Sequence, residues 1–199
     1  MGLNLTYKVG QTPIDEDEKE GLLIPTVTSQ EELNEFEQFN IEKAIEYYLL
    51  RRKFKKDIIL TQEFILKVHK QMFGDVWKWA GTLRNSNKNI GVDRFQISIR
   101  LKQLIDNCIF WIDHKTFSEE EIAIRFKHEL VAIHIFPNGN GRHSRLMGDI
   151  IMKQIFKKPS FTWGSKKLAS KNNNRKLYIT ALKKADQGDF KDLISFSMK

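Results

Sequence analysis

His134-Ile-Phe-Pro-Asn-Gly-Asn-Gly-Arg-His-Ser-Arg145 is the stretch of this 199-residue chain that decides its fold. A periodic apolar run over residues 122–133 enters the stretch and another over residues 146–155 leaves it, which predicts a loop between two helices. Pro137 ends the first helix, and Gly139-Asn140-Gly141 can adopt positive φ values that turn successive backbone N–H groups toward one point. These features predict an anion-binding site where the second helix begins.

The cationic side chains beside the loop support this prediction. Arg142, Arg145 and, when protonated, His143 fall in the first helical turn, where the positive end of the helix dipole disfavours cations. A phosphate held by the N–H groups and the guanidinium groups would remove the conflict. His134 lies across the turn, and a neutral imidazole beside a phosphate is suited to accept a hydroxyl proton. The pattern predicts group transfer to a hydroxyl; the structural alternative is a helix-capping His134 with arginines paired to acidic neighbours.

The stretch resembles the signature of the Fic (filamentation induced by cAMP) domain family. That signature runs His-x-Phe-x-(Asp/Glu)-Gly-Asn-Gly-Arg-x-x-Arg, and the chain matches it at every specified position except Asn138. Its Pro-Asn before Gly-Asn-Gly is similar to the branch called mobile mystery protein B. A second segment, Met72-Phe-Gly-Asp-Val-Trp-Lys-Trp-Ala-Gly-Thr-Leu-Arg84, resembles the part that precedes the target-docking flap of the family. The resemblance implies an all-α, Fic-type helical bundle with a small β-hairpin flap.

The resemblance also implies an activity, the transfer of AMP from ATP to a Tyr, Ser or Thr hydroxyl of a target protein. His134 would be the general base, Phe136 would anchor the loop in the core, and Arg145 would reach the γ-phosphate. The remaining phosphate-binding residues would be Gly139, Asn140, Gly141 and Arg142. The acidic residue that Asn138 replaces helps to hold Mg²⁺ in the family, and a neutral amide should bind that cation more weakly. We therefore expect Mg²⁺ to arrive already bound to the nucleotide.

The resemblance assigns two further sites. The flap is expected over roughly residues 87–97, where the sequence itself favours a short hairpin, with Asn89, Ile90, Gly91 and Val92 as the target-docking residues. Many Fic proteins carry a helix whose glutamate pairs with the second signature arginine and blocks productive ATP binding. No strict copy of that motif is present, and Glu37 is the nearest candidate by context. Our hypothesis at this stage is self-inhibition through a pair between Glu37 and Arg145.

Outside the signature, the chain is predicted to form one Fic domain at residues 29–199 after an irregular acidic lead-in at residues 1–28. The lead-in includes Asp15–Glu20, which is expected to be solvated or mobile. The domain would comprise an N-terminal helix at 29–54, a core at about 61–156 and C-terminal helices at 160–199. Helix starts are predicted from the capping residues Ser29, Thr61 and Ser118. His69 is assigned to the surface, off the apolar face of its helix.

Composition narrows the classes of protein. Hydrophobic residues make up 41% and charged residues 29%, which is typical of a globular protein, and no apolar run approaches the roughly 18 residues that a membrane span needs. No signal peptide precedes the first acidic run, and the lone Cys108 falls in an apolar helical stripe, so we expect a core thiol and a cytoplasmic protein. Residues 1–50 carry 11 acidic and 3 basic residues, whereas residues 51–199 carry 14 acidic and 30 basic ones. The two parts should attract each other.

Alternatives to the transferase remain open at this stage. One is a Fic fold with weak catalysis or another nucleotide donor, acting as a binding module. The other is a nucleic-acid-binding protein that uses the basic region after Pro159, with Trp163 and Tyr178 as stacking surfaces, and we expect it less. His128-Glu129 begins like a zinc-protease motif, but Ala132 occupies the second ligand position. The expected partner is a protein with a modifiable hydroxyl; a separate inhibitor and a homo-oligomer stay open, and no membrane is expected.

Overall fold

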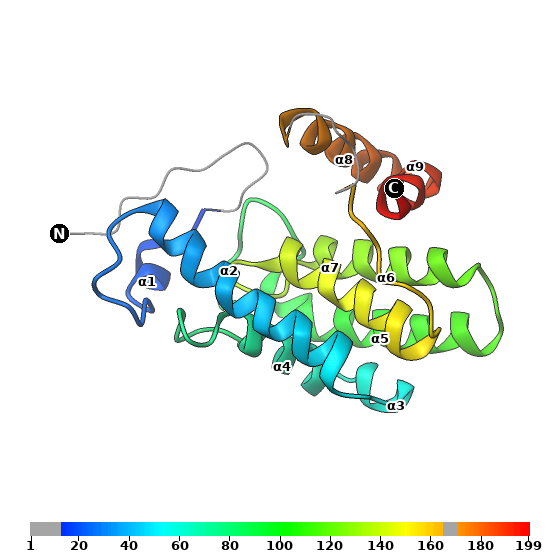
Figure 1. Ribbon diagram of the computed structural model, residues 1–199, viewed down its shortest axis with the longest axis horizontal. Coiled ribbons are helices and arrows are strands. Elements are labelled where there is room, and N and C mark those ends of the chain that lie inside the picture. The colour runs from blue at the N-terminus through cyan, green and yellow to red at the C-terminus, as the bar shows by residue number, and fades with distance from the viewer. Residues whose placement is uncertain (1–12, 165–170) are drawn as a thin grey trace.

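The computed structural model describes residues 13–164 and 171–199, and these residues form a bundle of helices (Figure 1). The elements are α1 (Glu16–Lys19), α2 (Gln30–Glu46), η1 (Tyr47–Arg51), α3 (Lys56–Ile59), α4 (Gln62–Phe73), η2 (Arg94–Gln96), α5 (Ile97–Asp113), α6 (Glu119–Ile133), α7 (Asn140–Ile150), η3 (Ile151–Ile155), α8 (Lys171–Ala185) and α9 (Lys191–Met198). Within the described residues the only β-type pairing is a single bridge between Leu22 and Trp77. The prediction of an all-α fold is therefore confirmed.

The predicted capping residues begin three of the long helices. The Ser29 side chain accepts a hydrogen bond from Glu32 N, and the Glu32 carboxylate accepts one from Ser29 N, which makes a complete capping box. Thr61 Oγ1 accepts from Phe64 N at 3.2 Å, and Ser118 Oγ accepts from Glu121 N at 3.2 Å. Each cap satisfies a donor that the first helical turn leaves without an intrahelical acceptor, so local sequence is enough to set these boundaries.

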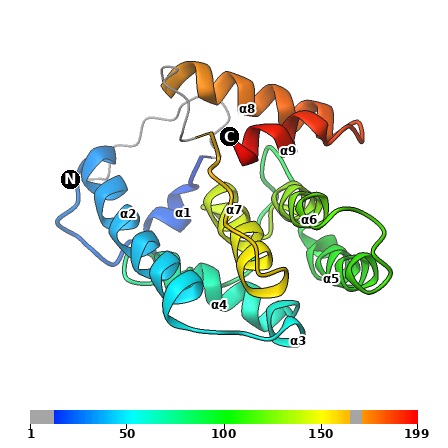
Figure 2. The same cartoon turned by 45° about the vertical axis from the view of Figure 1, so that its right-hand side comes forward.

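Helix α7 lies in the middle of the bundle, as Figure 2 shows, with α2 and α4 on one side of it and α6 and α5 on the other. Its apolar face, Leu146, Met147 and Ile150, is buried. Both α2 and α7 end in a π-helical turn, η1 and η3, and Gln154 joins the two turns by donating to Tyr48 O at 2.7 Å. Cys108 is fully buried in α5, as predicted. The signature loop is thus held between α6 and α7 at one end of a packed core.

The flap hairpin predicted over residues 87–97 does not form. Residues 85–93 make an irregular loop of turns, and η2 and the start of α5 take up residues 94–97. The loop's backbone is bonded to side chains: Arg84 donates to Ser86 O at 2.6 Å and also to Val92 O, while Asn87 Oδ1 accepts from Arg94 N at 2.8 Å. Because side chains take these backbone groups, no strand ladder is needed to satisfy them.

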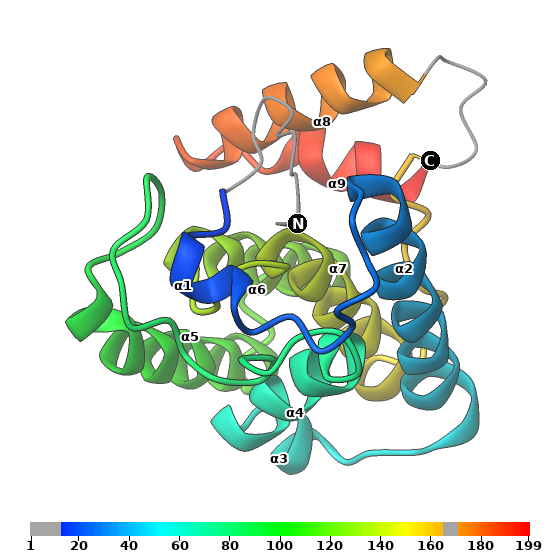
Figure 3. The same ribbon diagram turned by 90° about the vertical axis from the view of Figure 1, so that its left-hand side faces the viewer.

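The acidic lead-in is also more ordered than its charge suggested. Among the described residues 13–28, Ile14, Glu18 and Val27 are buried, and Leu23 N donates to Val76 O at 2.8 Å. Figure 3 shows this segment crossing the end of the bundle on its way to α2. The expectation that Asp15–Glu20 is solvated is therefore wrong for Glu18. The ion pair between the buried Glu18 and Lys88 agrees with the predicted attraction between the two oppositely charged parts of the chain.

The C-terminal helices α8 and α9 form a hairpin that lies over α6 (Figure 1). Polar contacts hold it there: Lys127 Nζ meets Tyr178 Oη at 2.6 Å and His128 Nε2 meets Asp186 Oδ1 at 2.8 Å. No helix of the described part of the chain combines the length and the apolar character that crossing a bilayer requires.

Candidate functional site

The signature loop opens into a cavity of about 970 Å³. Its walls come from the signature loop and the start of α7, from α2, from the end of α6, from the 85–92 loop and from the α8–α9 hairpin. They include Glu37, Ile90, Gly91, His134, Asn138, Gly139, Asn140, Gly141, Arg142, Arg145, Trp163, Tyr178, Leu182 and Asp186. Predicted site residues far apart in the sequence therefore meet around one space. These elements come from both ends of the chain and from its middle.

His134 closes α6 with a left-handed backbone, φ 58° and ψ 61°, and lines this cavity. The side chain is 4% exposed, with Nδ1 buried. Burial lowers the pKa of His134 to about 4, and the positive charge of Arg84 acts in the same direction. The imidazole is consequently neutral at pH 7, the form that can accept a proton.

The two glycines of the cradle have opposite surroundings. Gly139 has φ 79°, and a Cβ there would lie 2.7 Å from the Phe73 ring and 3.2 Å from His69 Nε2. At Gly141 a Cβ would meet nothing within 4 Å. Gly139 therefore allows the turn to pack on α4, whereas Gly141 leaves open space at the N-terminus of α7. Since the first N–H groups of a helix lack intrahelical acceptors, that open space suits an anion.

A buried scaffold holds the turn in shape from below. Asn140 Oδ1 accepts from Phe136 N at 2.9 Å and Asn140 Nδ2 donates to Phe136 O at 2.8 Å, so its side chain braces the loop and leaves the phosphates to its backbone. His69 lies under Phe136, with ring centroids 3.6 Å apart, and His69 Nε2 donates to Asn138 O at 3.0 Å. The assignment of His69 to the surface is wrong; the side chain is fully buried.

Arg142 forms an ion pair that the sequence hypothesis assigned to Arg145. Arg142 Nη1 lies 2.5 Å from Glu37 Oε2, and Glu37 Oε1 accepts from Trp77 Nε1 at 2.7 Å. Glu37 is 4% exposed, and the Arg142 guanidinium stands over the Phe73 ring at 4.8 Å. Glu37 does reach the signature, as predicted, but it contacts the first arginine of the motif and not the second. The position of Trp77 explains this choice, because its indole fixes the carboxylate from the opposite side.

Arg145 faces the C-terminal hairpin. Its guanidinium lies 5.9 Å from the Tyr178 ring centroid, and Tyr178 Oη also meets the fully buried Lys127. Burial alone would raise the pKa of Tyr178, but the charges of Lys127 and Arg145 outweigh it and lower that pKa. The same contacts, and a bond from Trp163 Nε1 to Asp149 Oδ2 at 3.0 Å, engage both aromatics of the nucleic-acid alternative inside the fold.

In the described part of the chain, the side chains around Asn138 do not form a set of ligands for Mg²⁺. Asn138 Oδ1 accepts from Gly139 N at 2.7 Å, so the amide oxygen that replaces the family's carboxylate is already used. No group of three or more His, Cys, Asp or Glu side chains in the described residues is placed to hold a metal. Any divalent cation in this cavity would therefore depend on oxygens brought by a ligand.

The 85–92 loop is joined to the signature loop by hydrogen bonds from Arg84, the residue before it, to His134 and Ile135. Arg84 is 3% exposed and donates from Nε to His134 O at 2.6 Å, while Arg84 N donates to Ile135 O at 2.9 Å. A Cβ at Gly91, which has φ 101°, would lie 2.5 Å from His134 Cβ. Ile90 and Gly91, two of the predicted target-docking residues, thus lie at the cavity beside His134; Asn89 and Val92 flank them in the same loop.

Sequence reasoning missed five residues that shape the site: His69, Trp77, Arg84, Lys127 and Tyr178 in this role. Two of them, Trp77 and Arg84, belong to the segment whose resemblance to the family had been noted, and that was the available signal. His69 and Lys127 gave none, because a polar residue off the apolar stripe of a helix is normally solvated.

Comparison with known proteins finds similar sequences and similar folds. The sequence model of the Fic/DOC family matches residues 59–152. The fold is similar to that of Fic-1 (residues 134–508) from C. elegans, with a TM-score of 0.63 and 22% identity over 90% of this chain. It is also similar to BepC from Bartonella tribocorum, solved with bound AMPPNP, with a TM-score of 0.66, 17% identity and 92% of this chain covered. For Bep8 from Bartonella sp. 1-1C the TM-score is 0.67 and the identity 14% over 94% of this chain.

The lengths of these proteins differ. The chain spans 50% of the C. elegans fragment, but 97% and 96% of the BepC and Bep8 chains. At such identities the structural likeness shows the fold. Residues 59–152 of this chain match the Fic/DOC family model.

Proposed function

We propose that this protein is a protein adenylyltransferase, which moves AMP from ATP to a Tyr, Ser or Thr hydroxyl of a target protein. The observation that carries the proposal is the meeting of a neutral imidazole, His134, with an open helix N-terminus and two arginines around one cavity. An anion-binding helix start beside a base is the arrangement that hydroxyl attack on a phosphate requires. The BepC structure with AMPPNP supports a nucleoside triphosphate as the donor.

In the proposed reaction the target hydroxyl gives its proton to His134 as its oxygen bonds to the α-phosphorus of ATP. The bond between that phosphorus and the oxygen bridging to the β-phosphorus breaks, and pyrophosphate leaves. The N–H groups at the start of α7, with Arg142 and Arg145, stabilise the charge on the phosphates. A bound triphosphate also places negative charge beside the imidazole, which raises the pKa of His134 from its low value in the free protein and makes it a stronger base.

The test is incorporation of label from [α-³²P]ATP into protein, with the mass of the added group measured on the intact chain and on its peptides. His134→Ala should lower the rate by about a hundredfold or more, because a positioned general base contributes roughly 10² to 10⁴. The matched control is His114→Ala, an exposed histidine at the end of α5. Label that persists in the His134 variant at the native rate would overturn the proposal.

We propose further that Glu37 restrains the enzyme. Its carboxylate holds Arg142 at 2.5 Å, and Trp77 supports it from the other side, so nucleotide phosphates must displace this pair to reach the arginine. The acidic α2 would then act as an internal inhibitor. It would keep the first signature arginine, and not the second, from binding the nucleotide phosphates.

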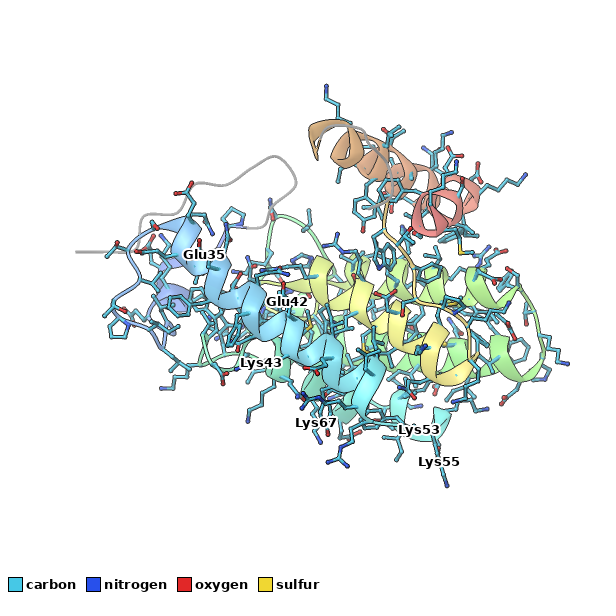
Figure 4. All side chains as sticks on the ribbon, in the orientation of Figure 1. Glu35, Glu42, Lys43, Lys53, Lys55 and Lys67 are labelled. Carbon is cyan, nitrogen blue, oxygen red and sulfur yellow. The ribbon has the colours of Figure 1, made fainter. Side chains whose placement is uncertain are left out.

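Glu37→Gln tests this restraint, because the amide keeps the shape and removes the charge. We expect ATP to bind several-fold more tightly and labelling to rise, since the arginine is released. Figure 4 labels two exposed glutamates of the same helix, Glu35 and Glu42, and Glu35→Gln is the matched control. Equal ATP affinities for the two variants and the native chain would remove Glu37 from any inhibitory role.

A further inference from the structure

Lys88, in the loop beside the catalytic turn, holds two carboxylates. Its Nζ lies 2.6 Å from Asp15 Oδ2 and 2.6 Å from Glu18 Oε2. The Lys88 side chain is only 3% exposed although it comes from a surface loop, and Glu18 is 7% exposed. The carboxylates come from α1 and its N-cap, about 70 residues away in sequence. A buried ammonium that donates to two carboxylates is suited to recognise acidic groups.

Lys88 lies close to the cavity that the proposed target hydroxyl would enter. Ile90 and Gly91 follow Lys88 closely and line the cavity with His134, and Ile14, next to Asp15, lines the same cavity. Ser86 of the loop adds a bond from its hydroxyl to Asp15 Oδ2 at 3.3 Å. Residues 13–18 therefore lie against this loop at the edge of the cavity.

The acidic turn is not a perfectly satisfied occupant. Glu18 Oε2 is well bonded, since it accepts from Asp15 N at 3.0 Å as well as from Lys88, but Glu18 Oε1 is buried without a hydrogen-bond partner. A buried carboxylate oxygen with no donor is unfavourable. Farther along, backbone bonds such as Lys78 N to Gly21 O at 2.8 Å fix the segment independently of the carboxylates. Release of the turn at residues 13–18 would leave these bonds in place; it would also expose the buried Ile14 and break the bond from Trp79 Nε1 to Glu18 O at 3.0 Å.

We propose that Lys88 recognises an acidic segment of the target protein, one with two carboxylates three residues apart on a helical turn, and that Asp15 and Glu18 occupy this place from within the chain. The choice of an acidic protein segment follows from the occupant itself, which shows both the charge and the spacing that the loop accepts. That the segment belongs to a target protein rests on the proposed transferase function, whereas its binding to Lys88 does not depend on that function.

The probe is a fluorescein-labelled peptide of residues 13–24, followed by fluorescence anisotropy with the full chain and without ATP. The peptide should bind the Asp15→Asn, Glu18→Gln double variant roughly tenfold more tightly than the native chain, because the internal occupant is weakened. A peptide with the same two substitutions should bind that variant about tenfold less tightly than the unmodified peptide. Two peptides with equal affinities would overturn the proposal.

A charge-reversal variant distinguishes loss of recognition from misfolding, because a misfolded chain would not gain a new binding preference. In the double variant, Lys88→Glu should abolish binding of the acidic peptide and create binding of a peptide that has Lys at both positions. Lys102→Glu is the matched control, since Lys102 is an exposed lysine of α5, and it should leave the affinity for the acidic peptide unchanged. If Lys88→Glu binds the acidic peptide as tightly as the control does, Lys88 does not recognise the acidic segment.

The two proposals can fail separately. Discrimination between the peptides without any transfer of label would leave the recognition site standing and remove the transferase. Transfer that depends on His134, with no discrimination between the peptides, would do the opposite.

Discussion

Gly139 and Gly141 are two residues apart, yet the structure requires glycine at them for different reasons. Position 139 has a positive φ and touches Phe73, so a side chain there meets the core. Position 141 faces open space where the phosphates are proposed to lie, so a side chain there meets only the ligand. One glycine serves folding and the other serves binding.

Substitution by alanine should separate the two roles. Gly139→Ala should destabilise the fold by about 2 kcal/mol or more, because the left-handed backbone and the contact with Phe73 both oppose a methyl group. Gly141→Ala should leave the melting temperature nearly unchanged and weaken ATP binding. Thermal unfolding and ATP titration of both variants check this; a reversed pattern would contradict the proposed position of the phosphates.

At this scale the sequence was informative where a residue acts through local chemistry. The signature specified His134, the glycines and the arginines, and these do meet at one cavity. It could not specify the partner of Glu37, because that depends on how Trp77, 40 residues away, approaches the carboxylate. Nor could it place His69, whose two ring nitrogens are bonded to backbone atoms of separate loops.

Among the elements, the α8–α9 hairpin depends on a buried polar pair for its seat on α6. Lys127 is fully buried, and its ammonium meets Tyr178 Oη at 2.6 Å. Burial lowers the pKa of Lys127, while Tyr178 opposes that shift. Removing one partner of such a pair leaves the other polar group buried without a bond, which lowers the free energy of unfolding. Replacing both partners by apolar groups can cost much less.

A double-mutant cycle should therefore be strongly non-additive. Tyr178→Phe should cost about 3 kcal/mol of unfolding free energy because it leaves the Lys127 ammonium buried without its hydroxyl. Lys127→Met combined with Tyr178→Phe should recover part of that loss. Urea unfolding of the single and double variants gives the four free energies, and simple additivity would show that the pair does not hold the hairpin.

The elements themselves were predictable to the degree that their ends are local. Ser29, Thr61 and Ser118 begin helices in the structure as the capping patterns predicted. The flap was not predictable, since alternating residues at 92–97 favour a strand, but Arg84 takes carbonyls that a strand partner would have used. A long side chain from outside the segment decided its conformation.

For the whole molecule, burial of neutral imidazoles makes stability depend on pH. Burial lowers the pKa of His143 to about 3 and that of His134 to about 4, and it lowers that of His69 well below its ordinary value. A histidine of low pKa in the folded state takes up protons more readily when unfolded, so its contribution is complete above pH 6.5 and is lost as the pH falls toward 3. Asp149 acts in the other direction, because burial raises its pKa to about 7.

Stability should accordingly fall as the pH is lowered from about 6.5, with the histidines outweighing Asp149. Asp149→Asn removes the opposing contribution and keeps an acceptor for Phe161 N, so the fall should become steeper in that variant. Circular dichroism melts between pH 4 and pH 8 measure both curves. A variant curve that is flatter than the native one would contradict the assignment of Asp149.

The first 50 residues of the sequence carry a net negative charge and the remainder a net positive one, and in the structure particular residues of the two parts form ion pairs. Glu37 meets Arg142, and Asp15 and Glu18 meet Lys88, so acidic residues of the first 50 bind basic residues of the remainder. Counting charges predicted the attraction. It could not predict which lysine or arginine would be chosen, because that follows from the packed backbone.

The close approach of Gly91 to His134, and the bond of Arg84 to the His134 carbonyl, join the loop to the proposed general base. A protein segment bound by the loop would therefore lie at a fixed position relative to the His134 imidazole. An engineer who wished to redirect this protein to a new client could rewrite the contact at Lys88 and leave the alignment for chemistry untouched.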